Sequence, residues 1–281
     1  MKNNKTKTEN GNKHMLGCIK DVEDKRDYLA KKLPKVSSPP AFSEKDYSDV
    51  LTSIKNQGNL GSCVGFAVTA VAEFYKQKEM INPTIDLSEM WTYWKAKEID
   101  QWPDQEGTSI RDALKILLHQ GIPLEKYWVY NDQRTADNKP TTNPSWYGKY
   151  SAAQRKIAGY YRINNLEEMY NWLDNYGPCI AGIECTNSIF NTGSDGMVTT
   201  PTATDQIIGG HAIAIVEYDR SEHYIGFKNS WAKTFGDLGF GYLDVDYYDN
   251  GFFMDVWGLL FTSSNMIPEE IKKKEAREEL W

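Results

Sequence analysis

The sequence predicts an α+β fold, with helices in the first half of the chain and antiparallel strands in the second. Before residue 150, apolar side chains recur with the 3.6-residue period of helices. After residue 150, short runs rich in Ile, Val, Phe and Tyr alternate with Gly, Asp and Ser, as antiparallel strands and their turns do. A chain of 281 residues is long enough for one large domain or for two lobes that share a cleft.

Three helices are expected in the first half. Residues 62–79 carry apolar side chains at helical spacing, with further Ala and Val on the other faces, which indicates a buried helix. Residues 87–100 and 108–121 show the same spacing, with Ser or Thr near the start as N-caps and a Gly-Ile-Pro stop after the last one. We therefore expect a helical lobe over residues 46–150.

The second half predicts a lobe built mainly from β-strands, over residues 151–265. One short helix is expected at residues 165–176, where a Gly-Pro pair stops it. The expected strands lie in four segments, "CIAGIEC" (179–185), "HAIAIVEYD" (211–219), "HYIGFKNSW" (223–231) and "GFGYLDVDYY" (239–248).

The two ends of the chain differ from both lobes. Residues 1–45, called the leader below, are polar, lack apolar periodicity and predict an extended segment. Residues 266–281 carry Glu–Lys pairs at helical spacing and predict a polar, solvated helix.

Composition excludes several classes of protein. The net charge of −7 argues against nucleic acid as the main partner. No apolar run reaches the roughly 18 residues of a membrane span, and the N-terminus lacks the apolar core of a signal peptide. We therefore expect no membrane partner and a cytoplasmic location. Four cysteines without a CxxC pair, and scattered histidines, predict neither a disulfide framework nor a metal site.

Cys63 stands where the turn "QGNLGS" becomes a helix. The N–H groups of a first helical turn are unsatisfied, and the helix dipole is positive there, so both favour a thiolate. A cysteine taken alone is more often a buried, inert thiol. The nucleophilic interpretation therefore needs a base nearby.

His211 is the best candidate base. Folding the predicted hairpin about residues 220–221 places His211 opposite Asn229 or Ser230, eighteen or nineteen residues later in the sequence. An Asn beside a His accepts the imidazole N–H and fixes the tautomer. Gly210, directly before His211, leaves room for a substrate backbone.

These motifs resemble the papain-like cysteine peptidases. The order "NQGNLGSC…GGHA…KNSW" agrees with that family, and so does the separation of 148 residues between Cys63 and His211. The stretch "EGTSIRDALKILLHQGIP" resembles the family's glycine loop and the helix after it, and "NSWAKTFGDLGFGYL" resembles its NSWG–WG–GY stretch. The resemblance spans about residues 50–260. It implies a papain-like two-lobe fold, in which a helical lobe and a β-barrel-like lobe flank the active-site cleft.

The resemblance also implies roles for individual residues. The implied catalytic set is Cys63 as nucleophile, His211 as base, Asn229 as its orienting partner, and Gln57 as oxyanion donor together with the Cys63 N–H. The resemblance also implies that Trp231 shields the His–Asn contact from water. The implied substrate-binding positions are Gly61, Ser62, Gly107, Thr108, Gly210 and Trp231.

The chain departs from the family pattern at several positions. Val64 replaces the aromatic residue that usually follows the nucleophile, and Leu60 replaces a disulfide cysteine. The second glycine of the substrate loop is Thr108, and the second tryptophan of the NSWG–WG stretch is Phe235. The missing disulfide fits a reducing compartment and a bacterial-type branch, whose leader the stretch "LGCIKDVEDKRDYL" also resembles.

The sequence therefore predicts a cysteine endopeptidase that works through a Cys-His-Asn triad and a thioester acyl-enzyme, without cofactor or metal. The expected partners are a peptide or protein substrate and the chain's own leader, as a candidate inhibitory propeptide. Leader-peptide processing or peptide ligation on the same site is an alternative, and so is a non-catalytic peptide-binding module. Cleavage specificity and oligomeric state stay open.

Overall fold

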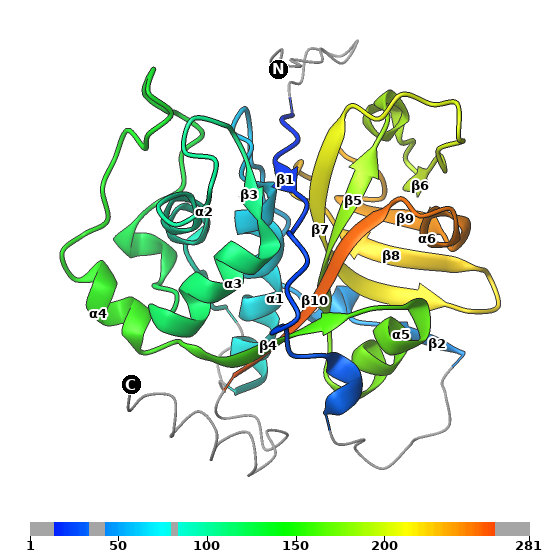
Figure 1. The fold of residues 1–281 in the computed structure, drawn as a ribbon, viewed down its shortest axis with the longest axis horizontal. Coiled ribbons are helices and arrows are strands. Elements are labelled where there is room, and N and C mark those ends of the chain that lie inside the picture. Colours follow the sequence, from blue (N-terminus) through cyan, green and yellow to red (C-terminus); the bar gives the residue numbers. More distant parts are fainter. Residues whose placement is uncertain (1–13, 34–42, 80–83, 262–281) are drawn as a thin grey trace.

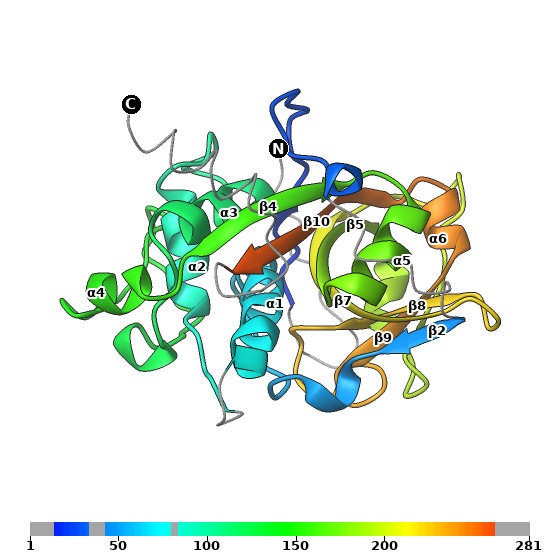
Figure 2. The same ribbon diagram turned by 90° about the horizontal axis from the view of Figure 1, so that it is seen from below.

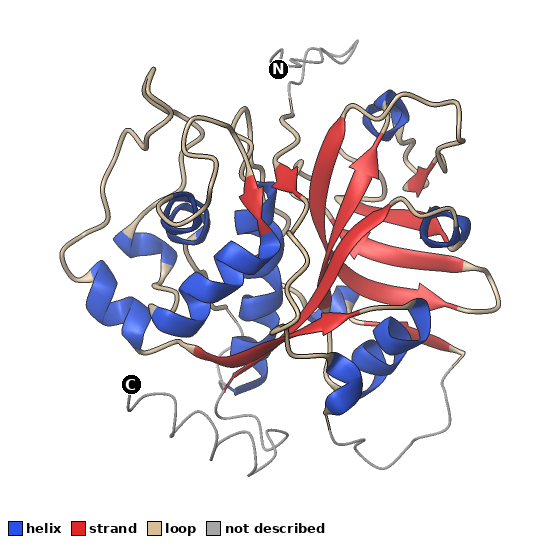
Figure 3. Cartoon of the chain, in the orientation of Figure 1, coloured by secondary structure: helices blue, strands red, loops and turns tan. Residues whose placement is uncertain are grey.

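The computed structural model describes residues 14–33, 43–79 and 84–261. The α-helices are α1 (Cys63–Glu79), α2 (Glu89–Lys97), α3 (Ile110–His119), α4 (Gly148–Ala153), α5 (Leu166–Asn175) and α6 (Asp246–Asp249). Figure 1 shows a helical side of the molecule and, on the other side, a large sheet with α5 and α6 beside it, and Figure 3 shows the same arrangement by colour. Short 3-10 turns lie at Ala30–Lys32, Ser48–Val50, Glu125–Tyr127 and Asn187–Asn191.

The helix α1 is the centre of the helical side. It packs against α2 and α3 on one side and against β7 on the other, which explains why its sequence is apolar nearly all round. The hydroxyl of Ser88 accepts the N–H of Trp91 and begins α2, and Ser109 caps α3 in the same way. The three predicted helices are present, each a few residues shorter at its ends than predicted, except α1, which begins one residue late.

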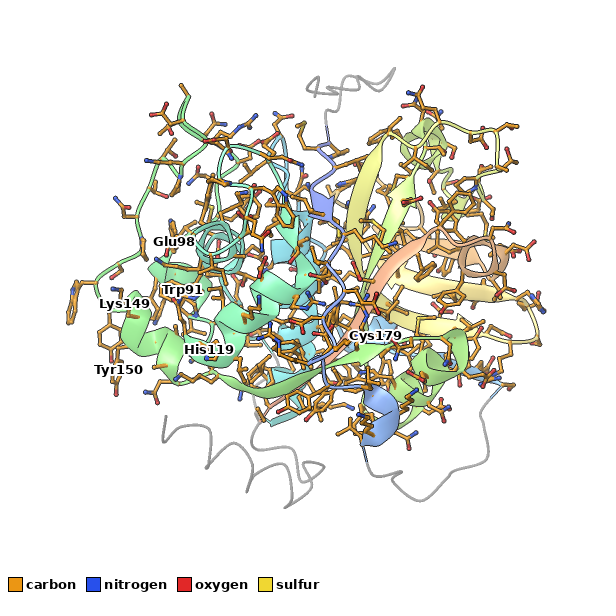
Figure 4. All side chains as sticks on the ribbon, viewed as in Figure 1. Trp91, Glu98, His119, Lys149, Tyr150 and Cys179 are labelled. Atoms are coloured by element: carbon orange, nitrogen blue, oxygen red, sulfur yellow. The ribbon has the colours of Figure 1, made fainter. Side chains whose placement is uncertain are left out.

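The sheet runs in the order β4-β10-β5-β7-β8-β9-β6, and β2 pairs with β7. Neighbouring strands are antiparallel except β6 and β9. Its strands are β2 (Glu44–Asp46), β4 (Ile157–Ile163), β5 (Cys179–Cys185), β6 (Met197–Val198), β7 (Gly209–Asp219), β8 (Tyr224–Lys228), β9 (Phe240–Asp244) and β10 (Phe253–Phe261). The predicted α+β class is confirmed. In Figure 4, Trp91 and His119 lie on the helical side, and Cys179 lies on the sheet side.

Both predicted lobe boundaries fall inside secondary-structure elements. The strand β2 crosses the boundary placed at residue 45 and belongs to the sheet, and α4 crosses the one placed at residue 150. The helix predicted at 266–281 lies outside the described residues. Within the described ranges, no helix is long and apolar enough to cross a membrane.

The first described part of the leader, around residues 14–19, lies between the helical side and the sheet. Its strand β1 (Cys18–Ile19) pairs in parallel with β3 (Thr108–Ser109), and β1 also contacts β7 and β5. Figures 1 and 2, in views at right angles, both show this segment between α1 and the sheet. Although its sequence lacks a core-forming pattern, the side chains of Cys18 and Leu33 are buried. We call residues 14–19 the groove segment.

Candidate active site

Cys63 is the first residue of α1 and is fully buried. Its Sγ accepts the N–H of Ala212 over 3.4 Å, and Ala212 follows His211 on β7. The predicted helix start and the predicted strand therefore bring the thiol to the backbone directly after His211. All four cysteines lie among the described residues, and all are unpaired and buried.

His211 and Asn229 are hydrogen-bonded. His211 Nε2 lies 2.9 Å from Asn229 Oδ1, and the N–H of Ser230 donates to the same oxygen over 2.8 Å. The Ser230 donor orients the amide with its oxygen toward His211. Because this oxygen accepts from Nε2, the proton sits on Nε2 and Nδ1 is left as an acceptor. Nδ1 is buried and has no hydrogen-bond partner among the described residues.

The hairpin that joins these two residues differs slightly from the prediction. The pair Asp219–Tyr224 centres it between residues 221 and 222, about one residue later than predicted. A bulge between Ile215 and Glu217 then shifts the register by one residue. The side chains of His211 and Asn229 still meet beyond the last pair of the ladder.

Trp231 covers the His–Asn pair. Its ring centroid lies 4.5 Å from that of His211, and the side chain is 1% exposed. Phe190 and Phe235 pack on the same indole at 5.3 Å each. This aromatic cover excludes water from the hydrogen bond, the position that the sequence resemblance implied for Trp231.

Gln57 is held with its amide nitrogen toward the groove. Its Oε1 accepts from Ser230 Oγ over 2.7 Å and from Trp231 Nε1 over 3.1 Å. Its Nε2 donates to the carbonyl of Leu60 over 2.9 Å and to the carbonyl of Met15 over 2.8 Å. The amide nitrogen predicted to hold an oxyanion thus already holds a peptide carbonyl of the leader.

The groove segment crosses the site where three glycines meet. A Cβ atom on Gly17 would overlap the carbonyl oxygen of Gly61 and lie 2.5 Å from its carbonyl carbon. Gly107 has φ of +89°, and a Cβ there would lie 2.8 Å from the Gly17 carbonyl carbon. The Thr108 N–H donates to the Gly17 carbonyl over 3.0 Å. Three of the predicted substrate-binding positions therefore contact a peptide backbone.

Other predicted positions divide into two groups. A Cβ on Gly210 would overlap the carbonyl oxygen of Cys18, so this glycine also borders the groove segment. Ser62 is different, because its buried hydroxyl is bonded to Tyr130 Oη at 2.7 Å. The side chain of Ser62 is therefore not available to a substrate. Val64, the residue after Cys63, is fully buried.

No sequence pattern predicted the contacts that hold the leader. The ring of His14 stacks on Trp231 at 5.0 Å, with planes 7° apart. Asp21 accepts from Trp257 Nε1 over 2.9 Å, and its N–H donates to Asp255 over 2.7 Å. Arg111 donates to the carbonyl of Val22 over 2.6 Å and to Asp27 over 2.7 Å. These partners are far apart in the sequence, and no local pattern marks them.

Burial disfavours the charged forms of the Cys63 thiol and the His211 imidazole. Burial raises the pKa of the Cys63 thiol to about 11, and the backbone amides of Ala212, Gly17 and Val64 oppose that rise. Burial lowers the pKa of His211 to about 4, the hydrogen bond of Asn229 opposes this, and the nearby His14 adds to it. At neutral pH the pair is a thiol and a neutral imidazole.

The fold and this arrangement of Cys, His, Asn and Gln define the class of the protein, a cysteine protease of the papain type. A family model described as "Papain family cysteine protease" matches residues 38–251, so the chain belongs to the papain family of cysteine proteases and is a hydrolase.

The sequence identity to individual relatives is low. The chain is 25% identical over 236 residues to an uncharacterised peptidase C1-like protein of Acanthamoeba polyphaga mimivirus, covering 79% of this chain and 71% of that one. It is 24% identical to cathepsin J of Rattus norvegicus over 72% of this chain, but spans only 59% of that protein. Among solved structures, xylellain from Xylella fastidiosa superposes with a TM-score of 0.75 at 24% identity, covering 88% of this chain and 96% of that one. This likeness shows the fold.

Proposed function

We propose that the chain is an endopeptidase that cleaves peptide bonds through a thioester on Cys63. One observation carries this proposal. Gln57 Nε2 already binds a peptide carbonyl, that of Met15, at a site that also holds a buried thiol and an imidazole oriented by Asn229. An oxyanion donor, a thiol and an oriented imidazole gathered in one peptide-binding site form the arrangement that acyl transfer requires.

The proposed reaction uses these groups in turn. His211 Nδ1 takes the proton of the Cys63 thiol, and the sulfur attacks the substrate carbonyl carbon. The carbonyl oxygen becomes an oxyanion, which Gln57 Nε2 and the Cys63 N–H stabilise. The C–N bond then breaks, His211 returns the proton to the leaving amine, and a thioester remains on Cys63. Water, deprotonated by His211, hydrolyses the thioester and restores the thiol.

The path of the groove segment favours an endopeptidase. At one end His14 stacks on Trp231, and at the other end Cys18 pairs with Thr108 on β3. The polypeptide therefore passes continuously along the site on both sides of Cys63. A substrate that follows the same groove keeps chain on both sides of the cleaved bond.

We also propose that the leader inhibits the enzyme by occupying this groove. The amide of Gly17 faces the Cys63 sulfur, which therefore meets an N–H and not a carbonyl carbon. With the Met15 carbonyl in the amide of Gln57, the segment blocks the site in a position where its own bonds are not attacked. Burial of the thiol and imidazole by the leader also keeps the pair neutral.

The experiment for this function is a cleavage profile on a peptide library, read by mass spectrometry. Hydrolysis predicts pairs of products that sum to the substrate plus water, whereas ligation predicts joined products. The control is Cys63→Ala, which should form neither. Activity retained by Cys63→Ala, or preferential labelling of another cysteine by iodoacetamide, would contradict the proposed nucleophile. Binding without any product would instead indicate a peptide-binding module.

A further inference from the structure

We propose that Lys97 is a positioning residue that fixes the orientation of the Gly107–Thr108 peptide, the backbone edge on which the substrate binds. This inference rests on the proposed function and goes beyond it, because Lys97 lies outside the catalytic set. Lys97 is the last residue of α2, and its side chain is buried. Figure 1 shows β3 between α2 and β1, and α2, which ends at Lys97, contacts this strand, which pairs with the groove segment.

The ammonium group of Lys97 gathers four acceptors. Nζ donates to the Asp100 carboxylate over 2.8 Å and to the carbonyls of Trp102, Gln105 and Gly107 over 2.6, 2.8 and 3.0 Å. The Asp100 side chain is fully buried and pairs with this charge. The segment from residue 98 to 107 has no helix or strand, so its inward carbonyls need a donor of this kind. One cation therefore organises the whole loop.

The last of these bonds reaches the groove directly. The Gly107 carbonyl and the Thr108 N–H belong to one planar peptide unit, so a donor on the oxygen fixes the direction of the N–H. That N–H donates to the Gly17 carbonyl over 3.0 Å. Two hydrogen bonds in sequence therefore connect Lys97, through this peptide unit, to the groove segment. The positive charge of Lys97 polarises the peptide and strengthens the bond that the Thr108 N–H makes.

The preceding peptide is held as well. The Gly107 N–H donates to Tyr93 Oη over 3.2 Å, and Tyr93 is also on α2. Both peptide units around Gly107 are therefore fixed by buried side chains of one helix.

The test compares Lys97→Met with Lys95→Met. The control removes a lysine from the same helical turn, one that pairs with Glu98 and does not touch the loop carbonyls. In the otherwise unchanged chain, Lys97→Met should loosen the leader and speed the iodoacetamide reaction of Cys63 about fivefold, the effect of one weakened hydrogen bond. Lys95→Met should leave that rate unchanged.

The kinetic part uses chains that also carry Gly17→Val, where the leader competes less with substrate. Lys97→Met should raise KM for a peptide about fivefold with little change in kcat, whereas a loss of folded enzyme would lower kcat at constant KM. If Lys97→Met does not fold, judged by thermal melting, Tyr93→Phe removes one bond to Gly107 and should show a smaller rise in KM.

The outcomes separate this inference from the proposed function. Unchanged alkylation and unchanged KM in Lys97→Met, with peptide hydrolysis intact, would overturn the role of Lys97 alone. A parent chain that hydrolyses no peptide would overturn the proposed function. In that case the rates of Cys63 alkylation in Lys97→Met and Lys95→Met would still show whether Lys97 positions the peptide that binds the leader.

Discussion

Replacing Gly17 by valine should activate the chain with its leader in place. A Cβ at this position would lie 2.5 Å from the carbonyl carbon of Gly61, and backbone atoms at that distance do not yield as a flexible side chain does. Overpacking of this kind costs about 1–3 kcal/mol. Because each 1.4 kcal/mol is a factor of ten, the ratio of closed to open leader should fall about 5- to 150-fold. The strain acts on the leader and leaves Cys63 and His211 unchanged.

The assay is the initial rate on a fluorogenic peptide, measured alongside the rate of Cys63 alkylation by iodoacetamide. Both rates should rise together in Gly17→Val. The matched control is Lys25→Val, which adds the same side chain at an exposed position of the leader. Equal rates in wild type and Gly17→Val, with both chains folded, would refute the view that the groove segment blocks the site. A similar rise in Lys25→Val would show that the effect is not specific to the contact between Gly17 and Gly61.

Three further predictions concern single side chains. Gln57→Ala in an opened chain should lower kcat by about 100- to 1,000-fold, the usual effect of one lost oxyanion donor, and a loss below tenfold would contradict its role. Burial lowers the pKa of His14 to about 4 when it is stacked on Trp231, so the exposed form holds its proton more tightly and acid favours opening. The alkylation rate of wild type relative to His14→Phe should therefore rise as pH falls from about 6.5 to 4, and a constant ratio would contradict this. Asp21 acts oppositely, because burial and then Asp255 raise its pKa to about 6 in the closed form, so acid favours closing through this group. The alkylation rate of Asp21→Asn, divided by that of wild type, should rise as pH falls from about 6 to 4. A ratio that falls over this range would exclude Asp21 as a titrating contact.

Much of the geometry of the candidate site was predictable from the sequence, because it depends on local patterns. The strand at 179–185 and the start of the helix at Cys63 follow from composition and from the turn before the helix. The hairpin needed only two strand-like runs and a polar turn to bring His211 to Asn229. An error of one residue in its centre did not matter, because the bulge and the long side chains accommodated it.

The resemblance suggested a leader that blocks the site, but the contacts that hold it in the groove could not be predicted, because backbone atoms make them. The Met15 carbonyl on Gln57 and the Gly17 carbonyl on Thr108 join positions 42 and 91 residues apart, and any residue type supplies a carbonyl. The same holds for Lys97, whose partners are three carbonyls and one carboxylate. A buried lysine in a helical pattern appears in the sequence as one more solvated charge.

The central claim, that Cys63 forms a thioester with the acyl half of a peptide, is tested most directly by trapping that intermediate. The Gly17→Val chain would be mixed with a peptide ester, quenched in acid within its first turnover and analysed by mass spectrometry. We predict an added mass equal to the acyl half of the substrate, located on the fragment that contains Cys63 and absent from Cys63→Ala. Substrate turnover without this adduct, or an adduct on Cys18, Cys179 or Cys185, would contradict the account.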